Sequence, residues 1–201
     1  MKNIFKFLTS LILITSLSNC IGVRAYKNPE IKPEELKISS IQKPKFFVNM
    51  QFKAPFAINK NPPKNFIDQA QSDQKRRFDE VIKESDCCEL VSKEGEANIL
   101  INGVFYNESS SVGLYAAFIS GLTFTAVPYW INSKMRVSVK ASKGKIVNDY
   151  DFADSFFMLT WLPLIVAMPF TESPIKQESA MNKNLYKNII IKMKNDGLLQ
   201  Y

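Results

Sequence analysis

The stretch MRVSVKASKGKIVNDYDF, residues 135–152, decides the fold. Its first part, residues 135–140, alternates apolar and polar side chains with a period of two, which is the pattern of a half-buried β-strand. Lys143-Gly144-Lys145 is a turn signal, and residues 146–152 are suited to a returning strand. The stretch therefore predicts an antiparallel β-hairpin with one face packed on a core.

Further elements are expected on both sides of this hairpin. Apolar, aromatic and β-branched residues predict strands at 46–52, 87–91 and 97–106. Apolar side chains recur at helical spacing over residues 64–85 and again over 175–194, which predicts two amphipathic helices. We expect an α+β fold, in which a small, mostly antiparallel sheet carries two helices packed on it.

Two uncharged apolar runs, residues 112–131 and 156–170, are expected to be helical or loop segments. The first is 20 residues long, about 30 Å as a helix and enough to span a bilayer. Three interpretations stay open: membrane-spanning helices, segments buried on the sheet, or exposed segments that contact a bilayer surface, another subunit or a lipidic ligand. The aromatic candidates for such membrane or partner contact are Tyr129, Trp130, Phe156, Phe157 and Trp161.

The N-terminus has the features of an export signal. Lys2 and Lys6 precede a run from Phe7 to Val23 that carries no charge. The apolar part ends in Leu17-Ser18-Asn19-Cys20, which resembles the lipobox of bacterial lipoproteins in the relaxed form found in spirochaetes. The resemblance implies that residues 1–19 are a removed signal peptide and that Cys20 is lipidated with fatty acids such as palmitate. An uncleaved anchor helix is the alternative.

The mature chain is expected to divide into two parts. Residues 20–45 hold three prolines and no sustained apolar period, which predicts a lipidated N-terminus followed by a flexible tether. Residues 46–201 then form a single α+β domain that includes both apolar runs. The order of elements, with the run from Ala97 to Gly103, resembles in topology the small α+β envelope lipoproteins such as the curli-secretion lipoprotein. That resemblance carries no functional residue across.

The composition excludes several classes of function. The chain of 201 residues contains no histidine, which rules out Ser-His-Asp and Cys-His catalysis and histidine-ligated zinc. Its net charge of +7 falls to +5 when Lys2 and Lys6 are removed with the signal peptide. The remaining basic residues are scattered, which argues against nucleic-acid binding. We expect no enzyme activity, no catalytic residue, no cofactor and no metal.

Two local clusters favour structural roles. In a short strand, Cys87 and Cys88 would point one thiol into the core and one to the edge. Asp149 and Asp151 would share one face of their strand, and Asp154 would not.

The sequence thus predicts a non-enzymatic lipoprotein of the bacterial cell envelope, anchored by lipid in the outer membrane. Its apolar segments would contact the membrane, an envelope protein or a second copy of the chain. The alternative is an accessory lipoprotein of an envelope transport or assembly system, which binds a lipidic or polymeric ligand.

Overall fold

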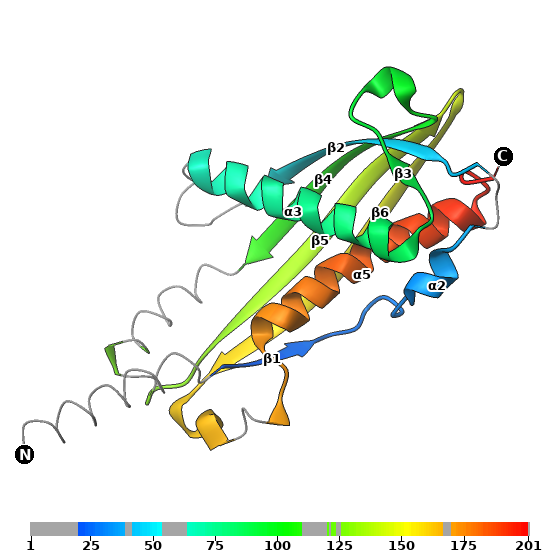
Figure 1. Cartoon of the computed structure of the whole chain (residues 1–201). Helices are drawn as coiled ribbons and strands as arrows, with labels where there is room; N and C mark the ends of the chain where they lie inside the picture. The colour runs from blue at the N-terminus through cyan, green and yellow to red at the C-terminus, as the bar shows by residue number, and fades with distance from the viewer. Residues whose placement is uncertain are drawn as a thin grey trace, which may run out of the picture.

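The computed structural model describes residues 20–38, 42–53, 64–109, 120, 122–123, 126–166 and 170–200. These residues form one curled sheet with helices packed against it, so the predicted α+β class is confirmed (Figure 1). The strands are β1 (Cys20–Arg24), β2 (Lys45–Lys53), β3 (Glu89–Leu90), β4 (Ile99–Ser109), β5 (Tyr129–Lys143) and β6 (Ile146–Thr160). The helices are α2 (Pro33–Leu36), α3 (Lys64–Ser85) and α5 (Pro174–Asn195), with 3₁₀ turns η1 (Glu94–Glu96) and η2 (Leu162–Val166).

The sheet is mixed, whereas the sequence predicts a mostly antiparallel one. Its strand order is β1-β6-β5-β4-β2-β3. Three pairs of neighbours are antiparallel, namely β1 with β6, β6 with β5, and β5 with β4. β2 lies parallel to both β4 and β3. The chain passes from β2 to β4 through α3, and such a crossover through a helix returns the chain in the same direction.

The predicted hairpin is confirmed, and it is longer than the alternating pattern indicates. β5 and β6 pair without interruption from Tyr129 opposite Thr160 to Lys143 opposite Ile146, closing at Gly144 with a φ of +58°. The end of run 112–131 and the start of run 156–170 are therefore strand, and neither is the helical or loop segment that we predict. Most of the rest of run 112–131 lies outside the described residues.

Among the described residues, no helix has the length and apolar character needed to cross a membrane.

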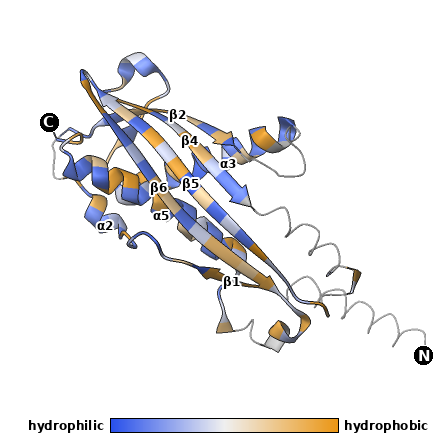
Figure 2. Ribbon diagram, turned by 180° about the vertical axis from the view of Figure 1, so that it is seen from behind, coloured by the Kyte–Doolittle hydropathy of each residue, from blue (hydrophilic) through white to orange (hydrophobic). Residues whose placement is uncertain are grey.

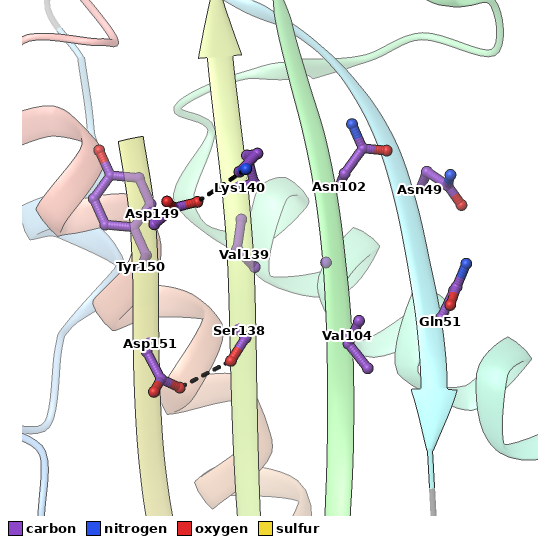
Figure 3. Close-up of a pocket in the computed structure, with 11 residues that line it drawn as sticks. Asn49, Gln51, Asn102, Val104, Ser138, Val139, Lys140, Asp149, Tyr150 and Asp151 are labelled. Carbon is purple, nitrogen blue, oxygen red and sulfur yellow. Dashed lines mark hydrogen bonds and ion pairs between the residues drawn. The ribbon is translucent and has the colours of Figure 1, made fainter. Parts of the chain in front are cut away.

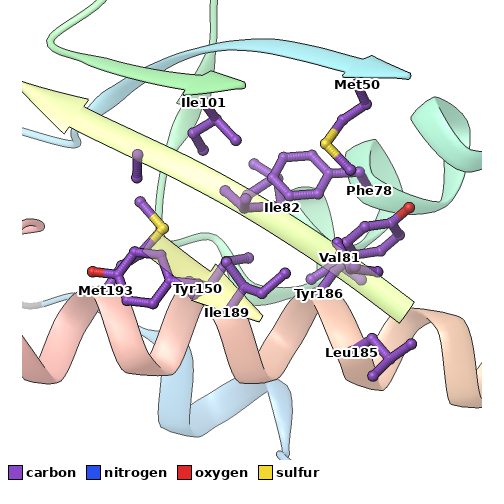
Figure 4. Close-up of a cluster of buried hydrophobic side chains, with 14 of the residues drawn as sticks. Met50, Phe78, Val81, Ile82, Ile101, Tyr150, Leu185, Tyr186, Ile189 and Met193 are labelled. Carbon is purple, nitrogen blue, oxygen red and sulfur yellow. The ribbon is translucent and has the colours of Figure 1, made fainter. Parts of the chain in front are cut away.

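The core lies between one face of the sheet and helices α3 and α5 (Figure 4). The buried faces of both helices are those predicted from their periodicity: Phe78, Val81 and Ile82 on α3, and Leu185, Ile189 and Met193 on α5. The ring of Phe78 packs edge-on against Tyr186, with 5.2 Å between the centroids. The Tyr186 hydroxyl donates to Gln74 Oε1 at 2.9 Å, which joins the two helices.

The N-terminal segment is part of the fold, so the prediction of a flexible tether over residues 20–45 is wrong. Residues 20–24 form the edge strand β1, and the side chains of Ile31 and Leu36 are buried. Asn184 of α5 accepts from the Ile31 backbone N–H at 2.9 Å and donates to the Pro29 carbonyl at 2.8 Å. The segment lacks a regular apolar period because its few buried residues are anchored singly, and composition does not reveal such anchors.

Candidate functional site

Cys20 lies at one end of the sheet, where three strands meet. It is the first residue of β1 and lies opposite Thr160, the last residue of β6. Thr160 lies in turn opposite Tyr129, the first residue of β5. The Cys20 Sγ is 2.9 Å from the Thr160 hydroxyl oxygen. The predicted lipidation position is therefore held by backbone pairing.

Exposed apolar side chains line the sheet beside Cys20. In the next register row Ile21 lies opposite Leu159, which lies opposite Trp130, and two rows further Val23 lies opposite Phe157. Alternation along the strands puts these five side chains on the open face, away from the helices. Trp130 is 60% exposed, Val23 55% and Phe157 39%. We call these five residues the apolar patch, and Figure 2 shows the hydrophobic colour over this end of β1, β5 and β6.

The segments that enter and leave the apolar patch extend its exposed apolar surface. Val127, two residues before β5, is exposed, and so are Trp161 and Leu162 directly after β6. A contiguous group of exposed apolar side chains normally marks an interaction site. This end of the sheet is therefore the strongest candidate for contact with a membrane or a partner.

The five aromatic residues that the sequence predicts as contacts do not share one environment. Trp130, Phe157 and Trp161 are exposed, and Tyr129 is half-buried. Phe156 is 6% exposed and faces the helices, so its prediction as a contact is wrong. Neighbouring residues on a strand point to opposite faces, and an uncharged run treated as one segment does not separate Phe156 from Phe157.

Ile21 and Val23 are not predicted as patch residues, because they fall at the start of the stretch predicted to be a tether. Their alternation with Cys20, Gly22 and Arg24 is the signal that could have shown a strand.

A buried ion pair fixes β1 in its register. Arg24 Nε donates to Asp154 Oδ2 at 2.8 Å, and both side chains are almost completely buried. The other carboxylate oxygen of Asp154 accepts the backbone N–H of Ser155 at 2.8 Å. Because a shift of β1 by one residue would separate these charges in a low-dielectric interior, the pair selects the register that places Cys20 beside Thr160.

The acidic residues of β6 are divided as the sequence predicts. Asp149 and Asp151 are exposed on the open face, and Asp154 is buried on the other. Among the described residues, no group of three or more cysteine or carboxylate side chains could hold a metal ion.

Both cysteines of the Cys87-Cys88 pair are buried and free, so the prediction of one edge thiol is wrong. Burial raises the pKa of the Cys88 thiol well above its ordinary value. The two residues precede β3 within the turn that follows α3, where no strand alternation separates them.

No protein-family model matches the chain, and no curated protein gives a significant match.

Proposed function

We propose that this protein is a non-enzymatic lipoprotein of the bacterial cell envelope, anchored through Cys20 and seated on the membrane by the apolar patch. The observation that carries the proposal is the placement of Cys20 at the end of the sheet. The residue that would carry the lipid begins a strand whose next outward-facing side chains, Ile21 and Val23, belong to the patch. The Cys20 side chain itself points to the other face of the sheet, towards Thr160. Lipid and patch would therefore lie at the same end of the sheet, on its two faces.

Burial of the acyl chains and burial of the apolar patch would both favour binding to a membrane. Two or three acyl chains make a durable anchor, at ~0.8 kcal/mol for each buried CH₂. The exposed halves of Trp130, Val23 and Phe157 would each add about 1 kcal/mol on burial. Tryptophan also suits the membrane interface, because its ring is apolar and its indole N–H is polar. The patch contribution is small beside the lipid, and it would orient the domain.

The residue that would carry the lipid is also the first residue of β1, so no flexible segment would separate the lipid from the sheet. Cys20 is itself paired with Thr160, so the lipid would hold the end of the sheet against the bilayer. β6 runs from Thr160 to Ile146, about 45 Å at ~3.3 Å per residue. In this arrangement the hairpin turn at Gly144 would be the part of the hairpin most distant from the membrane. We expect the membrane to be the outer membrane.

The alternative function is an accessory lipoprotein of envelope transport or assembly, and a second surface favours it. The central part of the open face is hollowed and lined by amide, hydroxyl and charged side chains, which would suit a polymeric ligand better than a lipid.

Two experiments test the anchor and the patch separately. Metabolic labelling with a fatty acid should label the wild-type chain and leave Cys20→Ala unlabelled, and a wild-type chain without label would overturn the anchor.

The patch can be tested by fluorescence, because the chain has two tryptophans, Trp130 and Trp161, and both lie at this end. The full chain is reconstituted into vesicles that contain brominated phospholipids. Trp130 emission in the Trp161→Phe variant should be quenched.

The matched control moves the tryptophan to the other end of the sheet. Ile146 is also an exposed apolar residue, and Ile146→Trp in a chain lacking Trp130 and Trp161 should stay unquenched. Equal quenching at both positions would contradict the proposed orientation. An unquenched Trp130 in a dimeric protein would show that a second copy covers the patch instead of the membrane.

A further inference from the structure

The central part of the open face carries two rows of polar side chains across four strands (Figure 3). They line a hollow of about 440 Å³, which we call the polar groove. In register, the first row is Asn49, Asn102, Lys140 and Asp149, and the second is Gln51, Val104, Ser138 and Asp151. The backbone beneath is already paired within the sheet, so only side chains are available to a ligand.

The charges of the polar groove neutralise each other. Lys140 Nζ is 3.9 Å from Asp149 Oδ1. Arg136 donates through both Nε and Nη2 to the Asp151 carboxylate, and Ser138 donates to the same group at 3.0 Å. Each cation therefore faces a carboxylate. The groove offers no net field that would attract a polyanion or a polycation.

Three amide side chains remain available. Asn49, Gln51 and Asn102 are exposed, and none of them makes a hydrogen bond to another described side chain. Asn49 and Asn102 lie opposite each other on neighbouring strands, about 4.8 Å apart. Each amide has an acceptor oxygen and two N–H donors, so each can both donate to and accept from a hydroxyl group.

Apolar side chains lie between and beside these amides. Val104 is half-buried in the second row, and Tyr106 follows two residues later on the same face of β4. A sugar ring presents C–H groups on its faces and hydroxyls at its edges. Amides that bond hydroxyls, next to a valine and a tyrosine that cover C–H faces, match that pattern.

We propose that the polar groove binds an uncharged glycan, with Asn49, Gln51 and Asn102 bonding its hydroxyls. An extended peptide would be expected at a strand edge, where backbone groups are free, and not across the middle of a sheet. A second copy packed face to face would bury apolar inner faces, and this part of the open face carries amide and charged side chains. Nucleic acid would need a net positive surface.

The position of the groove suits a polymer of the envelope. Ser138 lies eight residues along β5 from Trp130, about 26 Å at ~3.3 Å per residue. A chain seated on a membrane by its apolar patch would present the groove above the bilayer. The glycan site is a function additional to the membrane contact. It is independent of that contact, because it involves other residues and is tested by another experiment.

The test is a titration of the isotope-labelled full chain, in detergent, with chitohexaose and with cellohexaose, followed by NMR. Side-chain amide signals of Asn49, Gln51 and Asn102 should shift with at least one of these neutral hexasaccharides. Gln51→Ala and Asn102→Ala should each weaken binding about fivefold, since a net hydrogen bond contributes about 1 kcal/mol. Gln71→Ala, an exposed glutamine of α3, is the matched control and should leave the affinity unchanged.

Three results would overturn the glycan site. The first is the absence of shifts at these amides with either sugar up to about 10 mM, where even a binding free energy of about 3 kcal/mol gives occupancy. The second is unchanged affinity in Gln51→Ala and Asn102→Ala variants that keep the wild-type melting temperature. The third is a more than about tenfold loss of affinity between 50 and 500 mM NaCl, which would indicate a charged site.

Discussion

Cys20 lies opposite Thr160 at the end of the sheet, with its Sγ 2.9 Å from the Thr160 hydroxyl oxygen. This relationship places Cys20, the proposed lipidation residue, in a strand and not on a free tail. A lipid at this sulfur would therefore fix which end of the sheet approaches the membrane.

The number of titratable thiols reports lipidation. The described part of the chain has three free cysteines, of which Cys87 and Cys88 are buried. Native protein at pH 8 should therefore react slowly with a thiol reagent, because burial of both side chains hinders access. After denaturation we expect two thiols per chain, both in wild type and in Cys20→Ala. A third thiol in the denatured wild type would show that Cys20 is unmodified.

Breaking the buried ion pair should strongly destabilise the fold. Arg24→Met leaves the Asp154 carboxylate buried without its partner, and we expect a loss of about 3–5 kcal/mol in urea unfolding. Arg24→Met combined with Asp154→Leu should recover most of this loss, because no charge is then buried. The exposed Arg76 of α3, paired with Glu80, is the control: Arg76→Met should cost about 0.5 kcal/mol or less. A loss below about 1 kcal/mol in Arg24→Met would contradict a role for the pair in holding β1.

Gly22 permits the close approach of β1 to the core. A Cβ at this position would lie 2.6 Å from the ring of Phe156. Gly22→Ala should therefore destabilise the protein by about 1–3 kcal/mol, and adding Phe156→Leu should restore part of the loss. In Gly95→Ala the added Cβ meets no atom within 4 Å, so its melting temperature should be nearly unchanged. Equal melting temperatures for Gly22→Ala and Gly95→Ala would show that β1 is not packed as described.

Acid should weaken the bridge between α3 and α5. Lys183 of α5 lies 2.9 Å from Glu80 and 2.8 Å from Glu84 of α3. The hydrogen bond from Lys183 is the main reason that the pKa of Glu80 lies below its ordinary value of 4.5. Because the folded pKa is the lower one, the contribution of Glu80 is complete above the unfolded pKa and disappears as pH falls through the folded pKa.

The corresponding measurement is the melting temperature from pH 6 to pH 3. Glu80→Gln should lower the melting temperature at pH 6 by a few degrees at most, since the pair is exposed to solvent, and should have less effect at pH 3. Glu94→Gln, an exposed carboxylate in η1, is the control and should show no such difference. An effect of Glu80→Gln that grows towards pH 3 would reverse the sign and contradict the bridge.

Local patterning predicts much of the fold. The alternation over residues 135–140 and the turn at Gly144 predict the hairpin, and the helical spacing over 64–85 and 175–194 predicts α3 and α5. These elements can be predicted because apolar residues recur in each with the period of its own secondary structure. The buried face therefore shows in the sequence whichever element it packs against.

The candidate site is harder to predict from local sequence patterns. The start of β5 and the end of β6 lie in uncharged runs. Apolar and polar residues do not alternate there, so the sequence does not show that the strands continue into these runs. β1 is five residues long and has no turn signal before it. Phe156 and Phe157 differ only in the face of the sheet to which they point, and that face depends on register.

The sequence by itself determined the composition of the chain, namely an uncharged N-terminal run from Phe7 to Val23, two further uncharged apolar runs and the absence of histidine, because charge and polarity are properties of single residues. Only the tertiary structure decided that Cys20, Trp130 and Phe157 share one end of the sheet. Cys20 is more than a hundred residues from the other two in the chain, and their proximity results from antiparallel pairing of β1, β6 and β5 together with the buried Arg24–Asp154 contact. Those interactions exist only when distant segments meet, so no local pattern records them.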